Sequence, residues 1–291
     1  MRSIEYIELG ATLFVPGIHK DLEDIVSGKK YPNVKSVLID TEDGINQESL
    51  PNALEAIKTF LEKDLKLLPF VFIRPRDTDV LKKLLSEENI SKIDGFILPK
   101  FSLDNAKEYL EILKDSKHYI MPSIEGRELF NQTQLLELKE LLLKQKEKII
   151  LIRFGLEDML KQLKMRRGCD DNIFDISATS TVVGNFIATF TSSGFCISGG
   201  VYPCFKDSDG FTKDVLRDLK EGLFCKTIIH PSQIELTNEL YRVSQSEFDE
   251  ALEICKSDDA MFSQNGKMAE VVTMSPWAQD IIKRAEVYGV Y

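Results

Sequence analysis

Short apolar runs rich in β-branched residues alternate along the chain with longer segments in which apolar residues recur every three or four positions. The short runs predict strands, and the longer segments predict helices with one buried side. Eight strands follow from this pattern, at residues 12–15, 36–40, 70–74, 95–100, 119–125, 148–155, 195–202 and 226–230. The clearest helical patterns lie at residues 50–63, 78–85, 103–113 and 132–146.

Strands that alternate with helices are typical of parallel βαβ construction. Eight such units fill roughly the 250 residues of a (β/α)8 TIM barrel. We therefore expect an α/β fold, with the barrel over residues 1–240. The alternative, an open doubly wound sheet, would carry a glycine-rich phosphate turn after its first strand. Pro16-Gly17-Ile18-His19 stands at that place instead, so the barrel is favoured.

Two regions depart from the simple alternation of the barrel. Residues 159–191 exceed a barrel helix in length, and we expect a loop over the site followed by a helix. Residues 241–291 should form a C-terminal helical extension, because helical patterns at 247–255 and 276–288 flank the polar stretch 257–267.

Charge and composition narrow the possible partners. Lys and Arg number 37 against 47 Asp and Glu, for a net charge of −10, so we expect no nucleic acid partner. No apolar run reaches the length of a membrane span, and residues 1–10 do not resemble a signal peptide. The five cysteines are widely spaced and include no CxxC pair, which predicts reduced thiols in a cytoplasmic protein.

Charged and polar residues stand where the predicted strands end. In a barrel these ends converge on one face, where catalytic groups sit. From the second strand to the eighth, the residues at these ends are Glu42 and Asp43, Arg74 and Arg76, Lys100, Glu125 and Arg127, Asp158, Tyr202, and His230.

Several carboxylates at one mouth would repel one another unless a cation neutralised them. Oxygen ligands favour a hard ion such as Mg²⁺. We expect Glu125 and Asp158 to bind the metal directly, with Glu42 and Asp43 holding coordinated waters. The alternative is that these carboxylates only pair with the neighbouring arginines.

Eight short strings at these positions carry a family resemblance. In chain order they run Leu13 to Gly17, Ile39 to Asp43, Phe72 to Arg74, Ile97 to Lys100, Pro122 to Glu125, Phe154 to Asp158, Val201 to Pro203 and Ile229 to Gln233. In this order the chain resembles the citrate lyase beta subunit-like proteins of the HpcH/HpaI aldolase superfamily, whose members include malyl-CoA and citramalyl-CoA lyases.

The resemblance implies a Mg²⁺-dependent carbon–carbon lyase. Glu125 and Asp158 match the family's metal ligands, and Arg74 matches the residue that binds the substrate carboxylate and the developing enolate. The implied reaction is a retro-Claisen or retro-aldol cleavage of a β-hydroxy acid or its CoA thioester. Family members form trimers or hexamers, so a homo-oligomer is also implied.

Two positions depart from the family pattern. Cys204 follows Val201-Tyr-Pro203, where the family usually has an acidic residue. The family's acid/base aspartate follows a Gly-Arg/Lys-Met string, and here Gly266-Lys267-Met268-Ala269 leads to Glu270. A glutamate can transfer protons, so we expect Glu270 to be the catalytic acid or base.

The other strand-end residues are predicted to bind substrate: Arg74, Glu42, Asp43, Lys100, Tyr202 and His230. His230 could instead serve packing, and Lys100 could form a Schiff base or, more simply, pair with an acidic neighbour. Two alternatives to the lyase remain, a CoA-independent 2-oxo acid aldolase and an inactive barrel that acts as a binding or assembly subunit.

Overall fold

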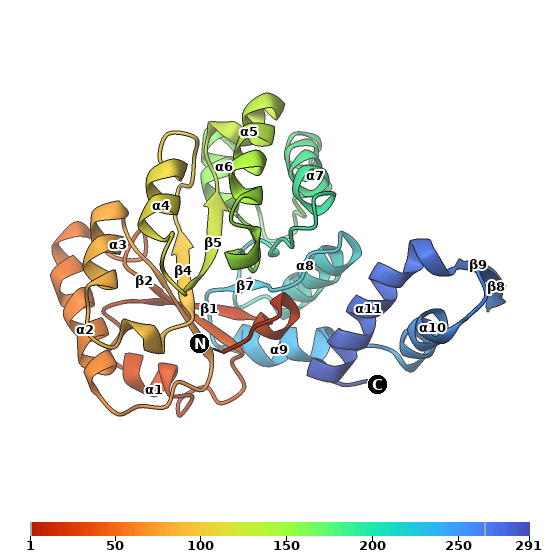
Figure 1. The fold of residues 1–291 in the computed structure, drawn as a ribbon, viewed down its shortest axis with the longest axis horizontal. Coiled ribbons are helices and arrows are strands. Elements are labelled where there is room, and N and C mark those ends of the chain that lie inside the picture. Colours follow the sequence, from red (N-terminus) through yellow and green to blue (C-terminus); the bar gives the residue numbers. More distant parts are fainter. Residues whose placement is uncertain (1, 265) are drawn as a thin grey trace. The chain divides into compact units, whose positions relative to one another are not determined.

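A computed structural model describes residues 2–264 and 266–291 of the chain. The chain divides into two compact units, Met1–Ile234 and Glu235–Tyr291, and each is described by itself (Figure 1).

The first unit is built on seven parallel strands. Neighbouring strands pair in the order β6-β5-β4-β3-β2-β1-β7, so the first strand lies between the second and the last. Six of the predicted strands recur with nearly the predicted bounds or as shorter pieces, and β7 occupies the eighth predicted position. The strands are β1 (Thr12–Pro16), β2 (Ser36–Asp40), β3 (Phe70–Arg74), β4 (Gly95–Leu98), β5 (Tyr119–Ile124), β6 (Arg153–Phe154) and β7 (Thr227–Ile228).

The predicted strand at residues 195–202 does not form a regular strand. Two isolated parallel bridges replace it, Ile152 with Ile197 and Ser198 with Phe224, and they connect the β6 side of the sheet to the β7 side. Gly199 and Gly200 follow directly, and glycine weakens strand formation. Gly199 is also needed for space, since a Cβ there would lie 2.2 Å from a carboxylate oxygen of Asp218.

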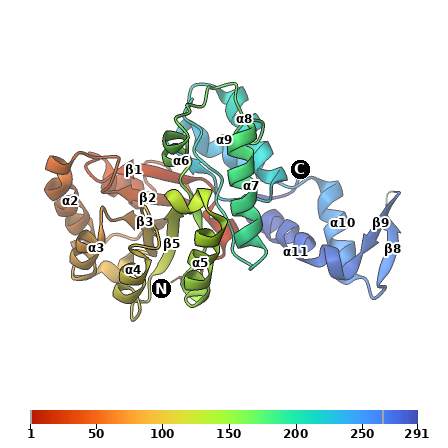
Figure 2. The ribbon, with the colours of Figure 1, turned by 90° about the horizontal axis from the view of Figure 1, so that it is seen from above.

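Helices follow most strands of the first unit. Figures 1 and 2 show α2, α3, α4 and α5 along the outer side of the sheet. The helices are α1 (Leu22–Val26), α2 (Leu50–Glu62), α3 (Thr78–Leu85), α4 (Ala106–Ile112), α5 (Gln132–Leu143), α6 (Leu156–Gln162), α7 (Ser177–Thr191), α8 (Ser208–Lys220) and α9 (Ser232–Leu240), the last crossing the boundary between the units. Short 3-10 turns occur at Tyr6–Leu9, Gln47–Ser49, Ile90–Lys92, Arg127–Phe130 and Lys146–Lys148.

The segment 159–191 was expected to be a loop followed by a helix; its first residues belong to α6, and the expected helix is α7. The two short predicted helices at 50–63 and 78–85 match α2 and α3 within one residue at each end.

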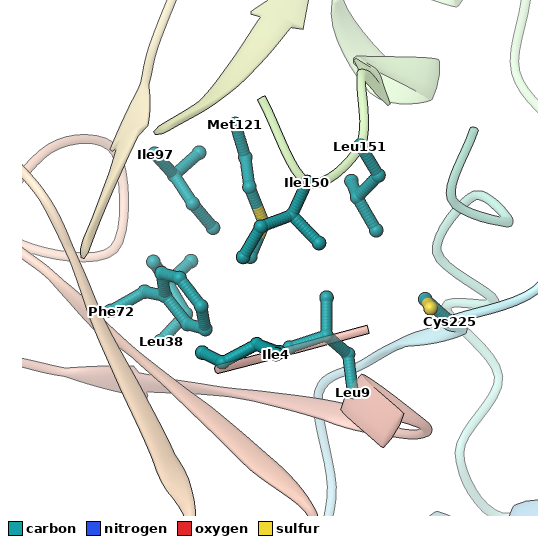
Figure 3. Close-up of a cluster of buried hydrophobic side chains, with 9 residues drawn as sticks. All are labelled: Ile4, Leu9, Leu38, Phe72, Ile97, Met121, Ile150, Leu151 and Cys225. Atoms are coloured by element: carbon teal, nitrogen blue, oxygen red, sulfur yellow. The ribbon is translucent and has the colours of Figure 1, made fainter. Parts of the chain in front are cut away.

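Apolar side chains fill the inside of the strand ring. Parallel strands buried on both faces read as nearly continuous apolar runs, and β2 is buried at all five positions. Figure 3 shows one such cluster, whose members come from the N-terminal segment, four strands and the segments before β6 and β7: Ile4, Leu9, Leu38, Phe72, Ile97, Met121, Ile150, Leu151 and Cys225. This packing fixes the strands whose ends carry the polar residues.

The second unit contains α10 (Gln245–Lys256), α11 (Val271–Tyr288) and a two-stranded antiparallel sheet, β8 (Met261–Gln264) with β9 (Lys267–Glu270). The expectation of helices is confirmed, although α11 begins five residues earlier than predicted. The polar stretch 257–267, for which the sequence analysis predicted no regular structure, contributes β8 and the first residue of β9 to a hairpin. No helix in the described part of the chain is long and apolar enough to cross a membrane.

Candidate active site

A cavity of about 340 Å³ opens at the carboxyl ends of the strands. Its lining combines carboxylates and guanidinium groups with apolar side chains. The residues that carry charge or hydrogen-bonding groups into it are Asp43, Arg74, Ser123, Glu125, Arg153, Glu157, Asp158 and Thr227. As expected, the fold brings together Arg74 of β3, Glu125 after β5 and Asp158 after β6.

Glu125 follows β5 directly and is only 6% exposed. One carboxylate oxygen accepts a hydrogen bond from the Lys100 backbone amide at 2.7 Å, and the other accepts from the Ser123 hydroxyl at 3.1 Å. Burial raises the pKa of Glu125 to about 7, and the nearby carboxylate of Asp158 acts in the same direction. A buried carboxylate that is costly to ionise alone would be stabilised by a cation.

Gly155 provides the space for that carboxylate. A Cβ at this position would lie 2.1 Å from one Glu125 oxygen and 2.2 Å from the Glu125 Cβ. Real contacts are never that close, so only glycine lets the chain between β6 and α6 pass this close to Glu125.

Asp158 lies in the first turn of α6, and its side chain is 27% exposed. Its carboxylate is 3.9 Å from the Lys161 ammonium, a loose contact between groups at the surface. The Gln162 side chain donates a hydrogen bond to the Glu125 carbonyl at 2.6 Å, which ties α6 to the end of β5. Glu125 and Asp158 thus face one cavity from adjacent strand ends.

Arg74 is held by the end of the neighbouring strand. Its Nε and Nη2 donate to the two oxygens of Asp40 at 2.7 and 2.6 Å, and Nη1 lies 3.3 Å from a Glu42 oxygen. Asp40 also accepts from the backbone amides of Glu42 and Gly44. Although burial opposes the charge, the Asp40 carboxylate raises the pKa of Arg74. The guanidinium is therefore a fixed cation at the cavity wall.

Lys100 forms a short network with two acidic residues. Its ammonium group pairs with Glu42 and, at 2.8 Å, with Asp43. Although burial opposes the charge, hydrogen bonds to Asp43 and Glu42 raise the pKa of Lys100. A charged, paired amine is a poor nucleophile, so this arrangement disfavours a Schiff base at Lys100.

Six residues were predicted to bind substrate, and only Arg74 and Asp43 line this cavity; the four that do not are Glu42, Lys100, Tyr202 and His230. Tyr202 is buried, and its hydroxyl lies 2.8 Å from an Asp207 oxygen and 2.9 Å from the Cys169 carbonyl. His230 contacts the Ser232 hydroxyl at 2.7 Å and stacks on Phe205. The side chains of Tyr202 and His230 therefore have partners close by in the chain or in the fold, as residues with a packing role do.

Glu270 belongs to the second unit, at the start of α11. Its predicted acid/base role stays a prediction.

The expectation that all cysteines are free is wrong for two of them. Cys169 and Cys204 form a disulfide, with Cα atoms 5.8 Å apart. The sequence gives no sign of this pairing, because 35 positions separate the two residues and only the folded loops bring them together. Cys196, Cys225 and Cys255 are not part of a disulfide.

Sequence reasoning missed three residues of the site. Asp40 was treated as the end of a strand, but it orients Arg74. Gly155 belongs to one of the family strings, but the sequence alone did not indicate that a side chain there would collide with Glu125. Arg153 was overlooked although it interrupts the apolar run Ile149 to Phe154, and a lone charge in a buried strand is a usable signal.

The donor set suits a hard divalent cation. Glu125 and Asp158 offer carboxylate oxygens only, and burial of Glu125 makes a neutralising cation favourable. Among the described residues, no group of three or more His, Cys, Asp or Glu side chains is placed to hold a metal. Two protein ligands, with the remaining positions left to water and substrate, is the pattern that Mg²⁺ commonly adopts.

The chain is similar in sequence to proteins of known activity. At 23% identity over 242 residues, the chain is similar to a (3S)-malyl-CoA thioesterase of Cereibacter sphaeroides, covering 82% of this chain and 79% of the relative. It is 26% identical over 151 residues to the citrate lyase subunit beta of Escherichia coli, covering 50% and 48%.

Solved structures show the same fold. The CitE protein of Mycobacterium tuberculosis, in complex with magnesium, acetoacetate and coenzyme A, superposes with a TM-score of 0.69 at 17% identity, over 97% of this chain and 99% of that chain. RipC of Yersinia pestis gives a TM-score of 0.64 at 16% identity, over 84% and 99%. The predicted TIM-barrel fold is thereby confirmed.

A family model described as C-C bond lyase of the TIM-barrel fold matches residues 3–290, nearly the whole chain. The prediction of a carbon–carbon lyase related to citrate lyase beta subunits agrees with this match and with the relatives. The chain belongs to the family of carbon–carbon bond lyases of the TIM-barrel fold.

Proposed function

We propose that this protein is a Mg²⁺-dependent lyase that cleaves or forms a carbon–carbon bond in a small β-hydroxy acid or its CoA thioester. The observation that carries the proposal is one cavity at the strand ends that holds the carboxylates of Glu125 and Asp158 beside the guanidinium of Arg74. The complexes of CitE with magnesium, and in one case with coenzyme A, support it by likeness of fold.

Glu125 and Asp158 would hold the metal. When bound, Mg²⁺ would act as a Lewis acid that polarises substrate oxygens and stabilises negative charge on them. Lys100 contributes through its backbone amide, which fixes one Glu125 oxygen.

Arg74 would bind a substrate carboxylate and stabilise the negative charge that develops on an enolate oxygen. Asp40 prevents the guanidinium from rotating, because it engages Nε and Nη2 together. A donor that is fixed before reaction costs no reorganisation when the charge develops. Asp43 lines the same cavity and is held by Lys100, so it can orient water or a substrate hydroxyl.

Glu270 is the proposed acid/base that moves the proton of the substrate hydroxyl. We further propose that the protein acts in the cytoplasm, as the sequence suggests, and that its substrate is a CoA thioester. Relatives named for malyl-CoA support a thioester, because the thioesterase covers 82% of this chain and a malyl-CoA/methylmalyl-CoA lyase covers 35%.

The thioesterase relative also favours a second candidate, hydrolysis of the thioester bond of the same substrate class. Both reactions begin with a bound hydroxyacyl-CoA, but their products differ. Cleavage of the carbon–carbon bond gives a carbonyl compound and a shorter acyl-CoA, whereas hydrolysis releases free CoA thiol.

The test is a panel of 3-hydroxyacyl-CoA esters and free 2-oxo acids, incubated with Mg²⁺ and followed for both kinds of product. We expect carbonyl formation from at least one ester, and loss of both turnover and Mg²⁺ binding in Glu125→Ala. Glu270→Gln should lower kcat by about 10²- to 10⁴-fold and keep Mg²⁺ binding. Asp104→Asn, which changes an exposed carboxylate paired with Arg127, is the matched control.

Other outcomes identify the alternatives. Thiol release without carbonyl formation would establish the thioesterase, and turnover of 2-oxo acids alone would establish a CoA-independent aldolase. Mg²⁺ binding that survives Glu125→Ala, or no turnover of any compound, would contradict the lyase and favour an inactive binding or assembly subunit.

A further inference from the structure

Arg153 is a buried cation in the wall of the cavity. It begins β6, is 3% exposed, and is one of the residues that line the cavity. Its Nη1 donates to the Thr227 hydroxyl and its Nη2 to the Thr12 hydroxyl, each at 3.0 Å. Its Nε has no hydrogen-bond partner. Two of its five N–H donors are thus used, both by neutral groups.

No carboxylate of residues 2–264 or 266–291 forms an ion pair with Arg153. Other buried cations of the same unit are paired, since Lys226 lies 2.6 Å from both Asp214 and Asp218, and Arg167 also pairs with Asp214. A buried guanidinium without a counter-ion is costly, so a purely structural role would call for a carboxylate partner.

Arg153 keeps its charge despite burial. Burial lowers the pKa of Arg153 to about 10, and the positive charge of Arg74 acts in the same direction. At neutral pH the guanidinium is therefore still protonated. Both arginines approach the ring of Phe14, at 5.4 Å for Arg74 and 5.7 Å for Arg153, so the cavity wall carries two cations around one apolar side chain.

The two arginines differ in one respect that matters for a ligand. Arg74 is largely neutralised by Asp40 and Glu42, whereas Arg153 is held in place only by hydroxyls that leave its charge uncompensated. Thr12 and Thr227 are paired residues of adjacent strands β1 and β7, so they orient the guanidinium rigidly. Arg153 is thus a preorganised anion-binding group, and no carboxylate of the described residues pairs with it.

We propose that Arg153 binds a second carboxylate of the substrate, in addition to the one at Arg74, so that the cavity selects dicarboxylic over monocarboxylic hydroxy acids or acyl groups. The inference rests on the proposed function for the location of the substrate, and it adds a specificity-determining residue. A cavity of about 340 Å³ has room for a small diacid between the two arginines.

The test compares L-malate with L-lactate, two stable 2-hydroxy acids that differ by one carboxylate. Binding to the whole protein is measured by calorimetry with and without Mg²⁺. Wild-type protein should bind malate at least about 10-fold more tightly than lactate, and Arg153→Met should weaken malate about 10- to 100-fold while leaving lactate unchanged. Arg153→Lys should restore part of the preference, and Arg127→Met, at an exposed arginine, should change neither affinity.

Thermal unfolding separates ligand binding from a structural role. If Arg153 has no internal anion to stabilise, Arg153→Met should keep or raise the Tm, whereas a structural arginine would lower it. Equal loss of malate and lactate binding, or no loss of either, would overturn the inference. Failure of the proposed function would look different, because malate binding would then be independent of both Mg²⁺ and Glu125→Gln. Absence of any binding by the wild type would overturn both.

Discussion

Glu125 occupies a space that exists only because residue 155 has no side chain. We predict that Gly155→Ala displaces the Glu125 carboxylate, since the new Cβ would lie 2.1 Å from one of its oxygens. A displacement of about 1 Å can cost about 10²-fold in rate, so activity should fall by at least about 10-fold, together with Mg²⁺ affinity. Calorimetric titration with Mg²⁺ measures the affinity.

Gly184→Ala is the matched control. Gly184 lies inside α7, and a Cβ there meets nothing within 4 Å. This variant should keep its metal affinity and gain a little stability, because alanine favours helix. Unchanged Mg²⁺ binding in Gly155→Ala would contradict the assignment of Glu125.

The protonation of Glu125 sets the pH dependence of metal binding. Burial raises its pKa to about 7, so the carboxylate of the metal-free protein is protonated below that pH and ionised above it. Mg²⁺ binds the ionised form, and its apparent affinity should therefore fall about 10-fold for each pH unit below 7 and level off above it. Titrations between pH 5.5 and 8.5 check this. An affinity that stays constant down to pH 5.5 would contradict it.

At the scale of elements, α8 is joined to the strand ring by buried charges. The Lys226 ammonium next to β7 lies 2.6 Å from both Asp214 and Asp218 of α8. We predict that Lys226→Met destabilises the protein by about 3–5 kcal/mol, because the buried Asp218 loses its cation and Asp214 keeps only Arg167. Urea unfolding measures the change, with the exposed Lys213→Met of the same helix as control. Equal stability of the two variants would contradict a structural role for this network.

The sequence predicts the elements well where one physical signal dominates. Apolar runs locate β2 and β3, and amphipathic spacing locates α2 and α3, because local burial decides these segments. The segment at 195–202 was harder, since Gly199 and Gly200 oppose the strand that the surrounding apolar residues favour.

The candidate site was predictable in part. Strand ends of a barrel converge, so the meeting of Arg74, Glu125 and Asp158 at one cavity follows from sequence order. Sequence order does not determine how the side chains are oriented. Tyr202, for example, stands at a predicted strand end, but its hydroxyl donates a hydrogen bond to Asp207. The disulfide of Cys169 with Cys204 depends on two loops whose paths have no sequence signature.

At the scale of the whole molecule, the second unit carries an exposed apolar surface. Four large apolar side chains of the hairpin and α11 are exposed to solvent, namely Met261, Met268, Val272 and Trp277. Apolar side chains gathered in one small unit often mark a subunit contact. We predict a homo-oligomer, with a mass of about three or six times 33.1 kDa in light scattering.

Val272→Glu should shift this mass toward the monomer, because it places a charge where a subunit contact would be apolar. Lys256→Glu, at the polar end of α10, is the control and should leave the mass unchanged. A monomeric wild type would contradict the prediction.

The central claim is that Glu125 and Asp158 hold one hard cation beside Arg74. A crystal of the protein grown with Mn²⁺ in place of Mg²⁺, with diffraction recorded at the manganese absorption edge, tests it most directly. We expect a single anomalous peak at about 2.1–2.2 Å from a carboxylate oxygen of each residue, and its loss in Glu125→Gln. A peak at other side chains, or no peak at saturating Mn²⁺, would contradict the claim.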